Sequence, residues 1–138
     1  MHPKTKAKLK AKLKRLTSRS WNIGYAGRKE VLTTAIRGWV SYYQLAEMRS
    51  FLEETDGWLR SRIRMCIWKS WKRVRTRYRN LRKCGFEHWQ ARYASCARKG
   101  YWRIAGSWIM TRAASNANLL KAGYPTLLGY YEKLHPRL

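Results

Sequence analysis

The side chains that could do chemistry in this sequence are mostly basic. The 138 residues contain 31 Lys and Arg but only seven Asp and Glu, which gives a formal net charge of +24. Asp56 is the only aspartate. Because enzymes that transfer nucleotides hold metal ions with several carboxylates, this composition predicts no catalytic site of that class. The charge instead predicts a polyanionic partner such as a nucleic acid.

Cysteine and histidine do not form a metal-binding pattern. The cysteines, Cys66, Cys84 and Cys96, are widely spaced, and the three histidines are scattered. No CxxC or HxxxH pair supplies neighbouring ligands, so we expect neither a metal site nor another cofactor. Asp56 stands four residues before Arg60, and the plainest interpretation of that spacing is an ion pair on one helix face.

Three sets of basic residues are candidates for binding phosphates. The first lies in the acid-free segment before residue 30, the second surrounds Trp68 and Trp71, and the third is rich in arginine, whose planar guanidinium suits bidentate phosphate contacts. A solvated lysine helix is the alternative for the first set, and burial is the more frequent role for the two tryptophans. The candidate nucleic-acid-binding residues are Lys10, Lys14, Arg15, Arg60, Arg64, Lys69, Lys72, Arg73, Arg75, Arg77, Arg79, Arg98, Lys99 and Arg103.

Hydrophobic periodicity predicts the helices that carry these residues. Leu9, Leu13 and Leu16 repeat at i, i+4 and i+7, which predicts a helix near 4–17 that begins after Pro3. Broader apolar faces predict two longer helices. They are expected at 28–46 and from about 48 to 73, with shorter helices within 74–85 and 86–100 and at 107–121 and 126–134. No segment alternates like a strand, so the predicted fold is all-α.

The predicted helices divide into a three-helix bundle over 1–73 and a smaller, basic helical region over 74–138. Trp39, Tyr42 and Tyr43 are expected on the core face of the second helix. Gly38 is expected to let two helices approach closely. The sequence has neither a run of about 18 apolar residues nor a signal-peptide pattern, so we expect no membrane partner and a cytoplasmic location.

Several motifs resemble the maturase-specific domain of group II intron-encoded proteins. RGWVSYY at 37–43 resembles the GW..YY signature of that domain, with Gly38, Trp39, Tyr42 and Tyr43 at the signature positions. The segment from Phe51 to Lys72 is similar to the helix that follows the signature. RKGYWRIA at 98–105 resembles a segment near the C-terminus of bacterial members. The motifs occur in the family's order and cover nearly the entire chain.

The resemblance implies a bacterial reverse transcriptase thumb that follows the fingers and palm. Such a thumb grips the group II intron RNA for splicing and closes over the template–primer duplex in retrohoming. The implied partners are therefore the intron RNA, the template–primer nucleic acid and the fingers–palm part of the polymerase. The polymerase carboxylates are missing here, so we expect no enzyme activity from this chain, while the parent would be an RNA-directed DNA polymerase. The alternative is a stand-alone basic module associated with the ribosome or the nucleoid.

Overall fold

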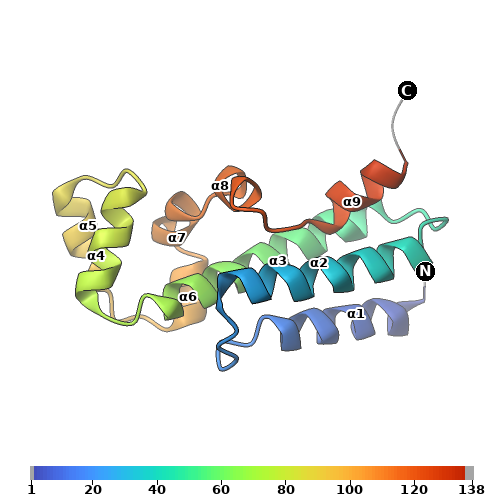
Figure 1. Ribbon diagram of the computed structural model, residues 1–138, viewed down its shortest axis with the longest axis horizontal. Coiled ribbons are helices and arrows are strands. Elements are labelled where there is room, and N and C mark those ends of the chain that lie inside the picture. Colours follow the sequence, from blue (N-terminus) through green and yellow to red (C-terminus); the bar gives the residue numbers. More distant parts are fainter. Residues whose placement is uncertain (1, 136–138) are drawn as a thin grey trace. The chain divides into compact units, whose positions relative to one another are not determined.

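The computed structural model describes residues 2–135, which contain α-helices and no strand (Figure 1). The predicted all-α fold is therefore confirmed. The helices are α1 (Pro3–Leu16), α2 (Gly24–Tyr42), α3 (Arg49–Ser70), α4 (Val74–Lys83), α5 (His88–Ser95), α6 (Tyr101–Ala105), α7 (Trp108–Ala113), α8 (Asn116–Lys121) and α9 (Leu127–Leu134).

The chain forms two compact units that are interleaved in the sequence. Unit 1 contains the residues up to Leu59 together with those from Ala122 onward, and unit 2 runs from Arg60 to Lys121. These units do not follow the predicted division after residue 73, because α9 comes back to pack on α2 in unit 1. The predicted boundary after residue 73, between a maturase domain and a C-terminal region, therefore stays a prediction.

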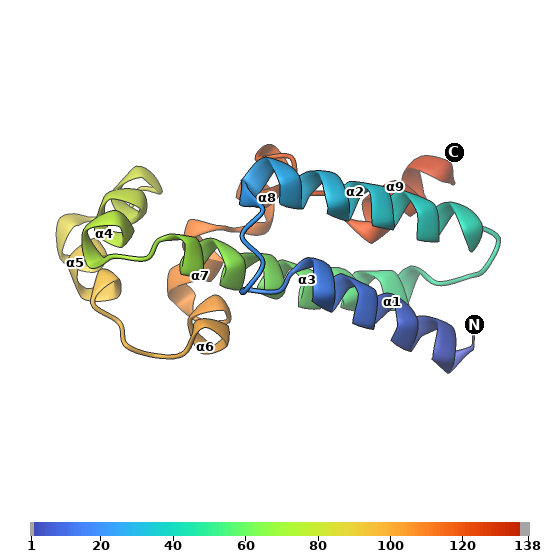
Figure 2. The same ribbon diagram turned by 60° about the horizontal axis from the view of Figure 1, so that its bottom comes forward.

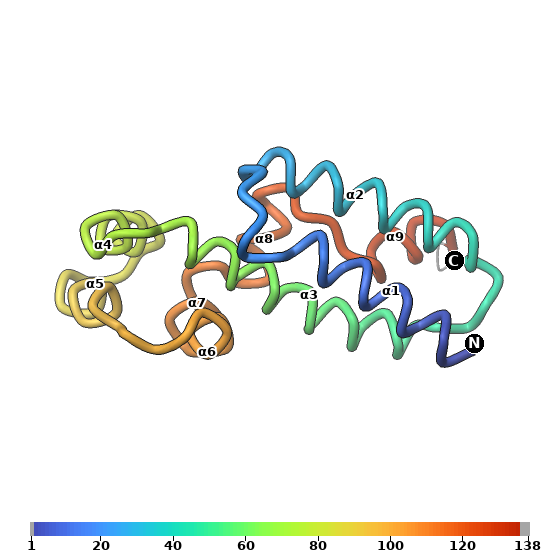
Figure 3. The backbone as a smooth tube through the Cα atoms, turned by 90° about the horizontal axis from the view of Figure 1, so that it is seen from below, coloured from blue at the N-terminus to red at the C-terminus, as the bar shows by residue number. Residues whose placement is uncertain are grey.

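Unit 1 is built around α1, α2 and the first half of α3, which lie side by side (Figures 1 and 3). The predicted leucine stripe of α1 is buried at Leu9 and Leu13, which are at most 2% exposed. Arg28 fixes the turn between α1 and α2, because its guanidinium donates to the carbonyl oxygens of Leu16 and Trp21, both at 2.7 Å. A buried arginine that satisfies carbonyl groups at a helix end stabilises the turn and is removed from any phosphate-binding surface.

Asp56 joins the C-terminal segment to unit 1. Its side chain is 3% exposed, and its two carboxylate oxygens accept hydrogen bonds from the backbone N–H groups of Leu127 (2.7 Å) and Leu128 (2.9 Å). These are the first N–H groups of α9, where a negative charge is favourable because of the helix dipole. The prediction of a local ion pair with Arg60 did not include this long-range contact of Asp56 with α9. The spacing to Arg60 is visible in the sequence, but the return of α9 is not.

Unit 2 contains the second half of α3 and helices α4 to α8. Trp68 and Trp71 are buried, and their rings meet edge to face with centroids 6.0 Å apart. This confirms the core role as the better interpretation of both tryptophans. In Figure 2, α4 lies beside α5 and α6 beside α7, in agreement with the contacts of these helix pairs.

The short helices of unit 2 differ from the predicted ones. Gly85, at φ +92°, follows the end of α4 as expected, since glycine adopts positive φ without strain. However, α5 ends at Ser95, and Gly100 is the N-cap of α6, a helix that was not predicted. The helix expected at 107–121 is two helices, with a break after Ala113. Helices this short depend on tertiary packing, so periodicity alone locates them poorly.

Candidate nucleic-acid interface

The cations of α1 point to three sides of the helix. Lys4, Lys8 and Arg15 lie on the face opposite the buried Leu9 and Leu13, because each residue advances by 100° around the axis. All three cations are exposed. The prediction included Arg15 but missed Lys4 and Lys8, although the same projection applied to the sequence would have found them.

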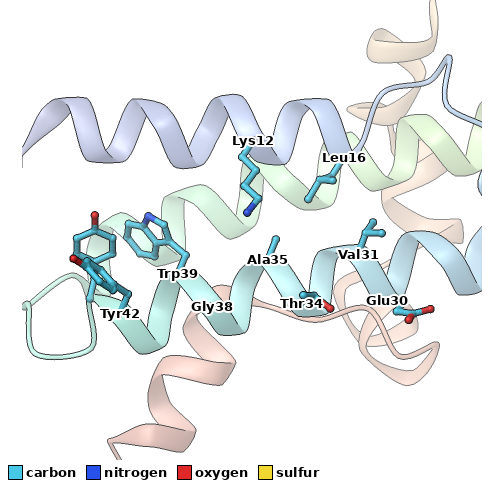
Figure 4. A pocket seen from close by; sticks show the side chains of 10 residues that line it. Lys12, Leu16, Glu30, Val31, Thr34, Ala35, Gly38, Trp39 and Tyr42 are labelled. Carbon is cyan, nitrogen blue, oxygen red and sulfur yellow. The ribbon is translucent and has the colours of Figure 1, made fainter.

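Three other lysines of α1 lean toward neighbouring helices. The Nζ atom of Lys10 lies 5.3 Å from the ring centroid of Trp58, and that of Lys6 lies 4.9 Å from the ring of Phe51. Lys12 is directed toward α2 (Figure 4). Lys14 is exposed. Lys10 and Lys14, both predicted, thus remain accessible, while the rings beside α1 orient Lys6 and Lys10 through cation–π contacts.

Most of the predicted cations in unit 2 are accessible. Half-buried positions are taken by Arg60, Lys69 and Arg77. The exposed predicted cations are Lys72, Arg73, Arg75, Arg79, Arg98, Lys99 and Arg103. Exposure is necessary for phosphate binding but does not demonstrate it, so these residues stay candidates.

Arg64 was predicted as a phosphate ligand, and this prediction is wrong for the structure. Its side chain is 7% exposed; Nε–H donates to the carbonyl oxygen of Ala114 at 2.7 Å, and Nη2–H donates to Oδ1 of Asn116 at 2.8 Å. Burial, with a smaller contribution from the charge of Arg60, lowers the pKa of Arg64. The guanidinium connects α3 to Ala114, which follows α7, and to Asn116, the first residue of α8. The helical period places Arg60 and Arg64 on one face, but it cannot tell which part of that face is covered.

Arg77 is also engaged within unit 2. Its guanidinium carbon lies 4.5 Å from the ring centroid of Trp68, and its Nε–H donates to the carbonyl oxygen of Trp71 at 2.9 Å. The half-buried side chain therefore covers the ring of Trp68 and satisfies the Trp71 carbonyl just after the end of α3. Its neighbours Arg75 and Arg79 are exposed one helical turn apart on α4.

The signature residues of α2 line an open groove between α1 and α2 (Figure 4). The groove has a volume of about 580 Å³. Tyr42 is 81% exposed, and a Cβ atom built on Gly38 would meet nothing within 4 Å. The expectations that Tyr42 lies in the core and that Gly38 permits a close helix approach are therefore wrong. Trp39 and Tyr43 are half-buried, with ring centroids 4.8 Å apart.

The sequence interpretation missed a set of exposed aromatic side chains in unit 2. Their exposed fractions range from 49% to 72%. The set contains Trp89, Tyr93, Trp102 and Trp108. A usable signal was present, because Trp89, Arg92, Tyr93 and Cys96 follow the spacing i, i+3, i+4 and i+7 of one helix face.

No group of three or more His, Cys, Asp or Glu side chains that could hold a metal ion occurs among residues 2–135. The three cysteines form no disulfide. Desolvation raises the pKa of the Cys84 thiol, which favours its protonated, less nucleophilic form. In the same part of the chain, no helix is both long enough and apolar enough to cross a membrane.

Comparison with known families agrees with the motifs. The family model of the group II intron maturase-specific domain matches residues 6–85, which is more than half of the chain and extends from α1 to the end of α4. No curated protein matches the chain. The match gives no support to an unrelated ribosomal or nucleoid module. The chain therefore belongs to the family of the group II intron maturase-specific domain, and its general role is RNA binding in intron splicing.

Proposed function

We propose that the chain holds folded intron RNA mainly by charge and shape, with the exposed cations of α1 as one of its principal contacts. The observation that carries this proposal is the composition of α1. Cations lie on three sides of the helix, and no carboxylate occurs before Glu30. A helix of this kind neutralises phosphates and releases their counterions whatever the base sequence.

The geometry of RNA favours this mode of binding. Double-stranded RNA has a deep, narrow major groove that side chains do not read, so proteins contact its phosphates and 2′-hydroxyls instead. Lys4 and Lys8 stand one helical turn apart, about 6 Å along the axis at 1.5 Å per residue. Ala7 and Ala11 lie beside them on the outer side of α1, where small side chains allow a phosphate backbone to come close.

The salt dependence of binding to a folded group II intron RNA tests this proposal. Each phosphate contact contributes about 0.7 to 0.9 to the slope of log affinity against log salt. The Lys4→Gln/Lys8→Gln variant should therefore lower the magnitude of the slope by about 1.5. Lys121→Gln/Lys133→Gln, which removes the same charge at exposed positions of α8 and α9, is the matched control. Equal changes in both variants would mean that net charge, and not α1, determines the binding.

We also propose a role for the chain in reverse transcription. In a complete polymerase the chain would act as the thumb, holding the template–primer duplex beside a fingers–palm part. The same exposed cations support this role, since a duplex presents two phosphate backbones. The isolated chain should extend no primer, because it lacks a carboxylate cluster among its residues 2–135.

Reassembly with a cognate fingers–palm fragment tests the thumb role. Adding the chain should restore primer extension, and Lys4→Gln/Lys8→Gln should shorten the products more than it slows addition of the first nucleotide. A weakened clamp raises dissociation between steps, whereas the polymerase metals still catalyse each step. If the fragment extends primers equally well with and without the chain, the thumb proposal is wrong, while the RNA-binding proposal is unaffected.

A further inference from the structure

A second groove, formed within unit 2, combines exposed aromatic rings with cations. It has a volume of about 840 Å³, which lies within the range of ordinary ligand sites, about 300 to 1,000 Å³. Its lining comes from α5, from the segment 96–99, from Ile104 of α6 and from Ser107 and the start of α7. The exposed aromatic rings and the cations of this lining are Trp89, Arg92, Tyr93, Arg98, Lys99 and Trp108.

Helix α5 presents two faces of opposite character. Ala91, Ala94 and Ser95 are buried against the rest of unit 2. Trp89 and Tyr93, one turn apart on the other face, are 65% and 72% exposed. Exposing two large rings on an eight-residue helix costs free energy in water, and contiguous exposed apolar surface of this kind is typical of binding sites.

Contacts within unit 2 already orient two of the rings. The indole Nε1–H of Trp89 donates to Oε2 of Glu87 at 2.8 Å. The Trp108 ring stacks on Phe86, with an interplanar angle of 16° and centroids 5.9 Å apart, and is 50% exposed. Ring planes held in this way lose little conformational entropy when a flat ligand stacks on them.

The charge of the groove selects the kind of ligand. Arg92, Arg98 and Lys99 are exposed around the rings, and the lining residues that the structure describes include no carboxylate. Nucleotides combine a flat, stacking base with a phosphate, and proteins bind unpaired strands with aromatic platforms in positively charged grooves. An acidic peptide would satisfy the cations but would leave the aromatic faces without stacking partners.

We propose that this α5–α7 groove binds unpaired nucleotides, with bases stacked on Trp89, Tyr93 or Trp108 and phosphates held by Arg92, Arg98 and Lys99. The inference rests on the proposed RNA-binding function and deepens it, since α1 supplies charge alone. A folded intron RNA offers unpaired bases in loops and bulges, and a displaced DNA strand offers the same chemistry. The groove lies outside the segment that the family model matches, residues 6–85.

Strands with and without bases test the proposal. The full chain is titrated with a short oligoadenylate, as RNA and as DNA, and with an abasic strand carrying the same number of phosphates. The base-containing strands should bind roughly tenfold more tightly than the abasic strand. Trp89→Ala/Tyr93→Ala should abolish this preference without changing affinity for the abasic strand. Trp89→Phe/Tyr93→Phe, which retains aromatic faces, should keep most of it.

Tyr42→Ala is the matched control, because Tyr42 is an exposed aromatic residue of unit 1. It should leave the preference for bases unchanged. A preference that survives in Trp89→Ala/Tyr93→Ala would overturn the inference. So would equal losses on strands with and without bases. The relative loss on RNA and on DNA identifies the strand that the groove takes. If the wild-type chain binds folded intron RNA with a steep salt dependence while the groove variants change nothing, only this inference fails; if it binds no RNA, the proposed function fails.

Discussion

Unit 1 and unit 2 both carry a large excess of cations, but they use them differently. On α1, Lys4, Lys8 and Arg15 lie on a fully exposed face. In unit 2, Arg64 and Arg77 are engaged in packing, while exposed aromatic rings accompany several of the remaining cations. A count of basic residues therefore does not measure a phosphate-binding surface. What matters is which guanidinium and ammonium groups are exposed instead of packed inside the protein, and which side chains lie beside them.

The largest effect is expected where a cation has become part of the fold. Arg64→Ala should lower the free energy of unfolding by about 3 kcal/mol, because it removes two hydrogen bonds from a charged donor and leaves a buried carbonyl of Ala114 without that partner. Arg75→Ala, at an exposed position, is the control and should change stability by less than about 0.5 kcal/mol. Chemical denaturation measures both. If Arg64→Ala were as stable as the wild type but bound RNA more weakly, Arg64 would be a phosphate ligand and not a packing residue.

Asp56 offers the corresponding test in unit 1. Asp56→Ala should cost about 2 kcal/mol, since it leaves the first N–H groups of α9 without their charged acceptor. Hydrogen exchange should accelerate at Leu127 and Leu128 before it does so in α4 and α5. The control is Glu53→Ala on an exposed position of α3, which should have little effect. Uniform acceleration over both units would contradict a role confined to unit 1.

Salt should affect binding at α1 and binding at the α5–α7 groove differently. Removing Lys4 and Lys8 should lower the salt slope of RNA binding, because counterion release depends on phosphate contacts. Removing the rings of Trp89 and Tyr93 should reduce affinity for unpaired RNA by roughly tenfold and leave the slope unchanged, since stacking releases few counterions. Filter binding over a range of salt concentrations separates the two responses. Equal slopes and equal losses in both variants would remove the distinction between the surfaces.

The smallest effect is expected at Gly38. Gly38→Ala should stabilise α2 by up to about 1 kcal/mol, because alanine has the higher helix propensity and the added methyl group meets open space. Gly85→Ala should destabilise the chain, since Gly85 holds a φ of +92°. In thermal unfolding, Gly38→Ala should raise the melting temperature and Gly85→Ala should lower it. A destabilised Gly38→Ala would restore the idea that this glycine permits close packing.

The sequence predicted the elements with strong local signals. The stripe of Leu9 and Leu13, the long helices α2 and α3 and the glycine that follows α4 are each determined within a few helical turns, and the structure confirms them. The family motifs at 37–43 and 51–72 also indicated the correct family, because both lie within the matched segment 6–85. The motif at 98–105 lies outside that segment and stays a resemblance. Local patterns of this kind survive folding because the same residues determine both the helix and its buried face.

The features that the sequence did not predict depend on distant parts of the chain. Arg64 becomes a packing residue only because Ala114 and Asn116 come to lie beside it, some 50 residues later. The role of Asp56 requires Leu127 in the same way. In the candidate interface, the exposed cations could be identified in part by helical projection, whereas the aromatic groove required α5, the 96–99 segment and α7 together. The hydrophobic periodicity of a single helix does not predict contacts between residues that are far apart in the sequence.

The link between Asp56 and α9 also orders events during protein synthesis. A chain leaves the ribosome from its N-terminus, and compact segments fold as units once they are available. All of unit 2 is made before residue 122, so unit 1 receives α9 only after unit 2 has been made. Unit 1 thus begins before unit 2 in the sequence but is completed after it. Until α9 has been made, the Asp56 carboxylate lacks the N–H groups that it later binds, so the nascent unit 1 is more open to proteases during that interval.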